Sequence, residues 1–230
     1  MINFIKNESS IIICDIGASP IDKTEFIDEL YNNSNSKIIG FEPNKDEFNK
    51  LEKDNPRKSY YNYAIGDGTE KFLNICKGTG MTSFLEPDMD YLKNFAWFDI
   101  NSEILKKEKV KTKKLDNLKD KIDFLKIDVQ GYESEVIKFG KEKIKNSLVI
   151  QLETSPIPLY KNEKTFSGVI GELEKLGFSL HMFNKINTKP FKPMKINNNI
   201  FLGINHLFQL DCVMIRNLKN IDNLNIEDLK

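Results

Sequence analysis

Four acidic residues each end a short apolar stretch of the kind that forms a buried strand. They are Asp15, Glu42, Asp128 and Glu153. The carboxyl ends of parallel strands share one rim of a sheet, and open α/β sheets bind their ligands in the crevice beside that rim. One acid at a strand end is as often a helix cap or a turn residue. Four of them at one rim instead indicate a binding or catalytic site.

The residues around this rim also indicate the chemistry of a cofactor. A carboxylate at the end of the second strand, such as Glu42, can accept hydrogen bonds from both hydroxyls of a ribose. The turn 15–20 contains only Gly17, whereas a pyrophosphate needs several glycines at a helix N-terminus, and Asp15 would repel a diphosphate. S-adenosylmethionine has no phosphate and carries an ammonium group. The sequence therefore favours this methyl donor over a dinucleotide.

Strands and helices alternate along most of the chain. Apolar runs predict strands within residues 11–19, 37–43, 59–64, 122–128, 147–153, 178–183 and 208–216. Helical spacing predicts helices over 26–31, 45–54 and 166–176, and another that follows Glu133 and ends at Gly140. Because consecutive strand–helix–strand units form parallel sheets with right-handed crossovers, we expect a doubly wound α/β fold. The sheet is expected to be mostly parallel and Rossmann-like, with an antiparallel last strand.

Residues 66–114 are less regular, and we expect them to form an insertion or lid near the mouth of the site. Short extended pieces are predicted there at 69–76, 81–86 and 110–114. The same region contains an aromatic cluster formed by Tyr91, Phe95, Trp97 and Phe98. We interpret the cluster as a small separate core under a loop, in preference to a cover over a substrate.

The end of the chain is more polar. Residues 184–203 are rich in Lys, Asn and Pro and predict an exposed loop, and the tail 218–230 predicts a frayed helix. Since no repeat or linker divides the sequence, one domain over residues 1–230 is expected.

The composition indicates a globular protein without a polyanionic partner. The chain has 34 basic and 34 acidic residues, so it has no net field that would attract nucleic acid or an anionic membrane. Residues 1–8 lack a signal-peptide cleavage site, and no apolar run reaches the roughly 18 residues of a spanning helix. The widely spaced Cys14, Cys76 and Cys212 are expected to be structural thiols. These features predict a cytoplasmic protein without a membrane span.

Six short motifs follow one another over roughly residues 10–155. They are Asp15-Ile16-Gly17-Ala18, Phe41-Glu42-Pro43, Ala64-Ile65-Gly66-Asp67, Thr82-Ser83, Leu115-Asp116 and the run from Leu125 to Glu133. Their order and spacing resemble those of the FkbM-type methyltransferases, a branch of the class I S-adenosylmethionine-dependent enzymes. The resemblance implies an enzyme that uses S-adenosylmethionine and methylates an oxygen of a small molecule or a glycan.

The resemblance also implies which residues bind the cofactor. They are Asp15, Gly17, Ala18, Ser19, Glu42, Ile65, Gly66, Asp67 and Asp128. Asp15 and Gly17 would hold the methionine part, and Glu42 would hold the ribose. Ile65 and Asp67 would contact the adenine ring and its amino group.

A hydroxyl acceptor must lose its proton when it is methylated, and Asp128 and Glu153 are the candidate bases. The resemblance places Asp128 at the rim nearest the transferred methyl group. Glu133, in the first turn of a helix, is interpreted as stabilising the helix dipole. Of the two histidines, His181 is expected to be structural within an apolar strand, whereas His206 precedes the last strand, within reach of the rim. No compact set of metal ligands is present in the sequence, so no metal site is predicted.

Three positions depart from the usual pattern of the family and leave alternatives open. Ser19 and Ile21 stand where the family usually has Asn and Gly, and Gln130 stands where it usually has Glu. These changes motivate a second interpretation, a protein that binds S-adenosylmethionine without transferring its methyl group. A third interpretation, an NAD-dependent oxidoreductase, is disfavoured by the missing glycine-rich fingerprint.

Overall fold

The structure is a computed structural model that describes residues 10–20, 25–217 and 219. Three of the sequence predictions fall on other residues. They are the absence of a leader over 1–8, the departure from the family pattern at Ile21, and the helical tail 218–230, of which only residue 219 is described.

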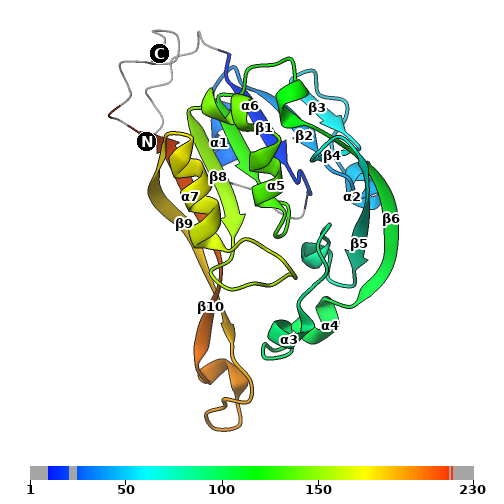
Figure 1. The fold of residues 1–230 in the computed structure, drawn as a ribbon, viewed down its shortest axis with the longest axis vertical. Helices are drawn as coiled ribbons and strands as arrows, with labels where there is room; N and C mark the ends of the chain where they lie inside the picture. The colour runs from blue at the N-terminus through cyan, green and yellow to red at the C-terminus, as the bar shows by residue number, and fades with distance from the viewer. Residues whose placement is uncertain (1–9, 21–24, 218, 220–230) are drawn as a thin grey trace.

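A seven-stranded sheet runs through the centre of the molecule (Figure 1). In their order across the sheet, its strands are β3 (Lys58–Tyr61), β2 (Lys37–Phe41), β1 (Ile12–Ile16), β7 (Phe124–Ile127), β8 (Val149–Thr154), β10 (Asn205–Arg216) and β9 (Phe178–Pro190). The strands from β3 to β8 in this order are parallel, and β10 is antiparallel to both of its neighbours. The predicted mostly parallel α/β sheet with an antiparallel last strand is therefore confirmed.

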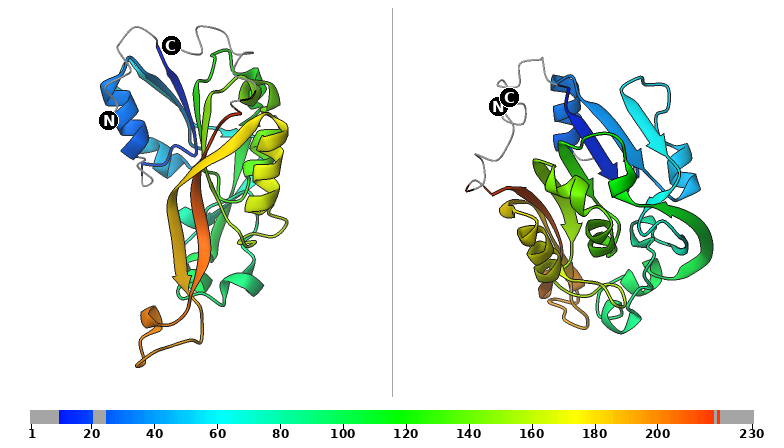
Figure 2. Two further views of the ribbon diagram at one scale, coloured as in Figure 1. Left: turned by 90° about the vertical axis from the view of Figure 1, so that its left-hand side faces the viewer. Right: turned by 45° about the horizontal axis from the view of Figure 1, so that its top comes forward.

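Helices cover both faces of the sheet (Figure 2). They are α1 (Glu25–Asn33), α2 (Lys45–Asn49), α5 (Glu133–Lys138), α6 (Lys141–Lys145) and α7 (Phe166–Lys175). On one face, Ile27 and Leu30 of α1 pack with Ile13 and Phe124. On the other face, the apolar side chains of α5, α6 and α7 pack with the alternate strand residues, such as Cys14. Both faces of the central strands are thus buried, which explains their nearly continuous apolar sequences.

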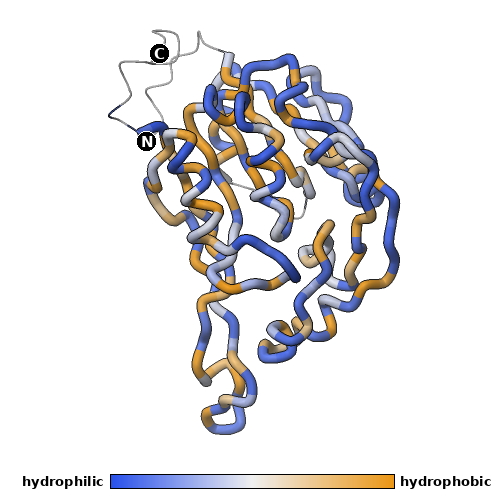
Figure 3. The backbone as a smooth tube through the Cα atoms, in the orientation of Figure 1, coloured by the Kyte–Doolittle hydropathy of each residue, from blue (hydrophilic) through white to orange (hydrophobic). Residues whose placement is uncertain are grey.

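Residues 64–113 build a second, smaller sheet at one side of the molecule. Its strands are β4 (Ala64–Ile65), β6 (Ile104–Lys113) and β5 (Glu70–Cys76), in that order. The extended piece predicted at 110–114 is the end of the longer β6. This strand is mostly exposed, and its lysines make it hydrophilic over much of its length (Figure 3). The strand predicted at 81–86 is wrong: the helical turn η1 (Thr79–Met81) leads into a single β-bridge between Asn74 and Ser83.

In the sequence between β5 and β6, the aromatic cluster lies on the short helices α3 (Met89–Leu92) and α4 (Phe98–Asn101) and on the segment that joins them. Phe95 is fully buried and packs with Phe208, and Phe98 packs against the same group. The separate core predicted for this region is confirmed for Phe95 and Phe98, whereas Tyr91 and Trp97 are exposed.

The exposed loop predicted at 184–203 is confirmed for the mostly exposed connection at 191–203 and is wrong for 184–190, which belong to a strand. β9 continues to Pro190, β10 begins at Asn205, and the turn between them holds η3 (Ile200–Leu202). This part of β9 pairs with β10 only, so the sheet does not bury it, and its Lys and Asn residues match an exposed strand as well as a loop. The helix predicted at 45–54 is shorter than expected and ends at Asn49. No helix in the described part of the chain is long and apolar enough to cross a membrane.

Candidate functional site

The site begins at the turn after β1, which packs against the turn after β7. The backbone N–H groups of Gly17 and Ala18 both donate to the carbonyl of Phe41, at 2.9 and 3.1 Å. Gly17 has φ of +85°, and a Cβ at this position would lie 1.8 Å from the carbonyl oxygen of Asp128. Only glycine fits such a close approach at a positive φ. The carboxyl ends of β1 and β7 are therefore in direct contact. The strand order reverses between these two strands, and open α/β sheets bind their ligands at such a point.

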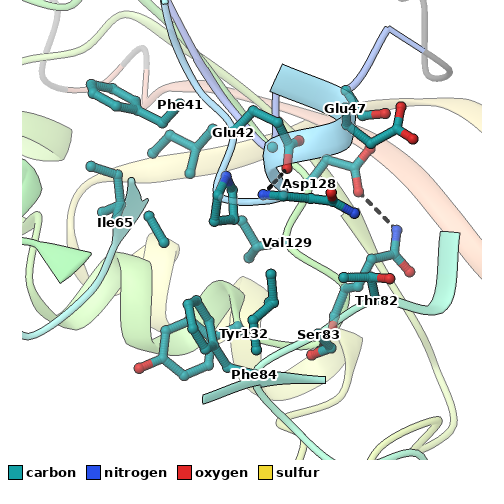
Figure 4. A pocket seen from close by; sticks show the side chains of 18 of the residues that line it. Phe41, Glu42, Glu47, Ile65, Thr82, Ser83, Phe84, Asp128, Val129 and Tyr132 are labelled. Atoms are coloured by element: carbon teal, nitrogen blue, oxygen red, sulfur yellow. Dashed lines mark hydrogen bonds between the residues drawn. The ribbon is translucent and has the colours of Figure 1, made fainter. Parts of the chain in front are cut away.

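A cavity opens beside these turns. Figure 4 shows that apolar side chains line one side of the cavity and polar side chains the other. The apolar side is formed by Phe41, Ile65, Phe84, Val129 and Tyr132, and the polar side by Glu42, Glu47, Thr82, Ser83 and Asp128. The cavity thus matches a ligand with one flat apolar part and one polar part.

Glu42 follows the end of β2 and is almost completely buried. Its Oε1 accepts the N–H of Asn44 at 2.7 Å, which fixes the carboxylate beside the cavity. Burial raises the pKa of Glu42 from its ordinary 4.5 to about 7, although the hydrogen bond from Asn44 lowers it. A buried carboxylate with such a pKa in a cavity is typical of a functional site.

Glu47, from α2, is a second buried carboxylate in the cavity wall, and the sequence analysis did not identify it. Its Oε1 pairs with Lys50 at 2.7 Å, and its Oε2 is buried without a hydrogen-bond partner among the described residues. Asn44 caps the helix by accepting the N–H of Asp46 at 3.0 Å. An acid three residues after such a cap faces back toward the start of the helix. That spacing is the sequence signal from which Glu47 could have been found.

Lys126 is a buried cation beneath the site. Its ammonium lies 3.3 Å from the carboxylate of Asp15, 3.5 Å from that of Asp128 and 3.4 Å from the carbonyl of Gly17. Asp15 and Lys126 are direct partners in the register of β1 and β7. A buried charge needs an opposite charge nearby. Lys126, which the sequence analysis noted only as part of a motif, therefore holds together the two carboxylates on either side of the strand reversal.

Gln130 joins the ends of β7 and β8. Its side-chain nitrogen donates to Asp128 at 2.9 Å and to Glu153 at 2.6 Å, while the hydroxyl of Tyr160 donates to its Oε1 at 3.3 Å. The Ser83 hydroxyl donates to the backbone carbonyl of Gln130 at 2.6 Å. Gln130 has φ of 52°, an uncommon conformation for a residue with a side chain. Its neutral amide places the two candidate bases next to each other.

The structure brings some of the predicted residues to the cavity wall and leaves others outside it. Those that line the cavity are Gly17, Ser19, Glu42, Ile65 and Asp128. Those that do not line it are Asp15, Ala18, Gly66, Asp67 and Glu153. Asp15 and Glu153 still connect to the wall through Lys126 and through Gln130, respectively.

Asp67 has other partners. It pairs with Lys71 at 2.8 Å and accepts hydrogen bonds from the N–H and the hydroxyl of Thr69 at 2.9 and 2.7 Å. The hydrogen bond from the Lys71 ammonium, and to a smaller extent those from Thr69, hold the pKa of Asp67 well below its ordinary value.

Three further candidates also lie away from the cavity wall. Glu133 is buried at the start of α5, where it accepts the N–H of Gly131 at 3.0 Å, and burial raises its pKa to about 8. His181 is exposed on β9, so the expectation that it packs inside an apolar strand is wrong. His206 lies within β10, where its ring contacts Phe95.

The chain is similar to solved methyltransferase structures at low sequence identity. The FkbM methyltransferase of Methylobacillus flagellatus KT has a TM-score of 0.48 and 12% identity, over 90% of this chain and 44% of that one. Magnesium protoporphyrin IX methyltransferase from Synechocystis PCC 6803, solved with bound S-adenosylmethionine, has a TM-score of 0.45 and 9% identity, over 90% and 70% of the two chains. A putative S-adenosylmethionine-dependent methyltransferase from Listeria monocytogenes has a TM-score of 0.42 and 12% identity, over 90% and 91%.

This chain thus spans less than half of the Methylobacillus protein. A comparison with curated proteins found no match. Among protein families, the Methyltransferase FkbM domain matches residues 15–180, which is well over half of the sequence. The chain therefore belongs to the FkbM methyltransferase family, whose methyl donor is S-adenosylmethionine.

Proposed function

We propose that this protein transfers a methyl group from S-adenosylmethionine to a hydroxyl oxygen of a small molecule or a glycan, and that the donor binds in the cavity beside β1 and β2. The observation that carries the proposal is the division of this cavity into an apolar side and a side with three carboxylates, Glu42, Glu47 and Asp128. The choice of oxygen as the acceptor atom rests on the family resemblance.

The residues of the cavity fit this methyl donor. Its ribose hydroxyls and ammonium group are hydrogen-bond donors, and carboxylates are the strongest acceptors for them. The orphaned Oε2 of Glu47 is a buried acceptor that lacks a donor within the described residues. Phe41 and Ile65 line the apolar side of the cavity, against which a purine would pack. A dinucleotide fits less well, because its diphosphate would meet carboxylates in place of N–H donors.

In this proposal Glu42 binds the ribose and Asp128 lies at the reacting end. S-adenosylmethionine supplies a methyl group on a positively charged sulfur, which makes that group an electrophile. The protein must orient the acceptor hydroxyl and take up its proton. Asp128 and Glu153, which share the amide of Gln130, are the groups that would accept it. The second sheet, most of which belongs to the predicted lid region 66–114, would cover the cavity on its apolar side.

The test is a screen of hydroxyl compounds with methyl-labelled donor, carried out on the wild type and on Asp128→Asn and Glu153→Gln variants. Removing the base is expected to lower the transfer rate by roughly 10²–10⁴-fold while the donor still binds. Asp90→Asn, at an exposed carboxylate on α3, is the matched control and should leave the rate unchanged. Tight binding of the donor without transfer to any acceptor would favour the alternative of an inactive binding protein.

A further inference from the structure

The β9–β10 hairpin projects beyond the rest of the large sheet (Figures 1 and 2). β8 pairs with β10 only from Leu210 to Ile215, whereas β9 pairs with β10 down to the pair Asn205 and Pro190. Among the described residues, the part of the ribbon before Leu210 therefore pairs with no third strand. Since β9 runs in the same direction as β8, the hairpin extends from the end of the sheet at which the cavity opens.

An aromatic cluster holds this hairpin against residues 94–99. Phe95 lies between Phe191 and Phe208, with ring centroids 5.5 and 5.0 Å apart. The N–H of Lys192 donates to the carbonyl of Asn94 at 2.7 Å. The hairpin is thus fixed to the body of the protein, so the side chains at its tip are presented on a supported surface.

The tip exposes a group of large apolar side chains, which we call the tip patch. It consists of Trp97, Met194, Ile196, Phe201, Leu202 and Ile204, each 42–59% exposed. The rings of Trp97 and Phe201 stack with centroids 5.2 Å apart, which joins the two segments that form the patch. Single exposed apolar residues are ordinary, but a group of this size usually marks a surface that contacts a partner or a membrane.

The charge of the hairpin points to the kind of partner. The hairpin sequence has no Asp or Glu from Phe178 to Leu210, whereas four lysines, at 185, 189, 192 and 195, fall in the same interval. Lys192 pairs with Asp99 at 3.1 Å, and Lys195 lies within the tip itself. The whole chain has no net charge, so its composition does not reveal this local excess of positive charge. Apolar side chains with Trp and Lys around them are typical of a surface that enters the interface of an anionic membrane.

We propose that the tip patch docks the protein onto the surface of a membrane that contains anionic lipids. The apolar side chains would enter the boundary between headgroups and acyl chains, and the lysines would contact the headgroups. A second copy of this chain is a poorer partner, because a symmetric contact would bring the same lysines face to face. The cavity would then open toward the membrane, since it lies at the same end of the sheet.

The chain contains one tryptophan, and it belongs to the tip patch, so its fluorescence reports on docking directly. The wild-type protein would be mixed with vesicles of phosphatidylcholine alone or with equal parts of phosphatidylserine. We expect a blue shift of Trp97 emission with the anionic vesicles only, quenching by lipids brominated in the acyl chain, and reversal by added salt. Unchanged emission with anionic vesicles would overturn the proposal, as would an equal shift with both kinds of vesicle.

Paired variants separate the tip from the rest of the surface. Phe201→Ser with Leu202→Ser should lower co-sedimentation with anionic vesicles by at least about tenfold. Phe72→Ser with Leu105→Ser is the matched control, because both residues are 60% exposed on the second sheet, and it should sediment like the wild type. Lys195→Glu changes a side chain that forms no hydrogen bond or ion pair with the described residues, and it should weaken sedimentation as well. If the tip variant instead sedimented normally, or converted a wild-type dimer to a monomer in light scattering, the tip would be a contact of another kind and the proposal would fail.

Discussion

The side-chain nitrogen of Gln130 lies 2.6 Å from Oε2 of Glu153, so a neutral amide ties the turn after β7 to the end of β8. The same nitrogen lies 2.9 Å from Oδ1 of Asp128. One amide group thus supplies both of its N–H donors to two carboxylates and holds them side by side. This arrangement depends on the residue being Gln, because a third acid at this position would offer acceptors in place of donors.

The first prediction concerns the charge at residue 130. Gln130→Glu places a third carboxyl group against two others, so one of the three should hold a proton with a raised pKa in the folded state. A carboxyl whose pKa is raised by folding makes the protein less stable as the pH rises above the ordinary carboxyl pKa. The melting temperature of the variant should therefore be close to that of the wild type near pH 5 and clearly lower near pH 8, by the equivalent of about 1–3 kcal/mol. Gln130→Met removes both donors but adds no third carboxyl group, so its stability should fall less between pH 5 and pH 8 than that of Gln130→Glu. Equal pH profiles of the two variants would contradict the prediction.

A second prediction follows from the pKa of Glu42, which burial raises to about 7. The ionised carboxylate accepts hydrogen bonds from ribose hydroxyls better than the protonated form does. The affinity for S-adenosylhomocysteine, the demethylated product, should therefore rise as the pH increases through about 7. Calorimetry near pH 6 and pH 8 would measure this change, and Glu42→Gln should bind roughly tenfold more weakly at pH 8 and show little pH dependence. A wild-type affinity that is flat over this range would exclude Glu42 as the group that binds the ribose.

Two glycines provide a matched pair for the third prediction. Gly17→Ala should destabilise the fold by at least about 3 kcal/mol, because its Cβ would collide with the Asp128 carbonyl at a positive φ. Apart from its chain neighbours and the backbone of α7, no atom of the described residues lies within 4 Å of a Cβ placed on Gly171. Gly171→Ala should instead stabilise the protein by about 0.5–1 kcal/mol, since glycine weakens a helix. Urea unfolding measures both, and similar effects of the two substitutions would mean that the turn at Gly17 is not as tight as described.

The buried Lys126 gives a fourth prediction. Lys126→Met would leave the carboxylates of Asp15 and Asp128 without their shared cation, which should cost about 3–5 kcal/mol. Adding Asp15→Asn to this variant removes one of the uncompensated charges. The double variant should therefore be more stable than the sum of the two single effects predicts, by about 0.5–3 kcal/mol. Additive losses in a double-mutant cycle would show that the two residues do not interact.

Sequence reasoning predicted the large sheet well, because its central strands are apolar on both faces and end on acids. Cys14 and Leu125, for example, are register partners in the interior. The apolar runs of such strands predict a buried strand without a competing pattern of exposed polar residues. Reasoning from the sequence failed where strands are exposed. In β6 and in the outer half of β9, pairing within a ribbon outweighs the preference of Lys and Asn for loops.

The site was predicted in part for a similar reason. Strand ends located Glu42 and Asp128 correctly at one cavity, since parallel strands bring their ends to one rim. Glu47 comes from a helix, and the link between Gln130 and Glu153 depends on a positive φ that the sequence does not reveal. Asp67 shows the opposite case: its motif is present, but Lys71 and Thr69 occupy its carboxylate.

The central claim is that the cavity beside β1 and β2 binds S-adenosylmethionine. Calorimetric titration of the purified protein with S-adenosylhomocysteine, and then with NAD, tests it most directly. We predict saturable binding of S-adenosylhomocysteine at one site, no binding of NAD, and an affinity weakened by about 1.5–3 kcal/mol in Glu42→Ala. Saturable binding of NAD, no binding of S-adenosylhomocysteine, or unchanged affinity in the variant would contradict it.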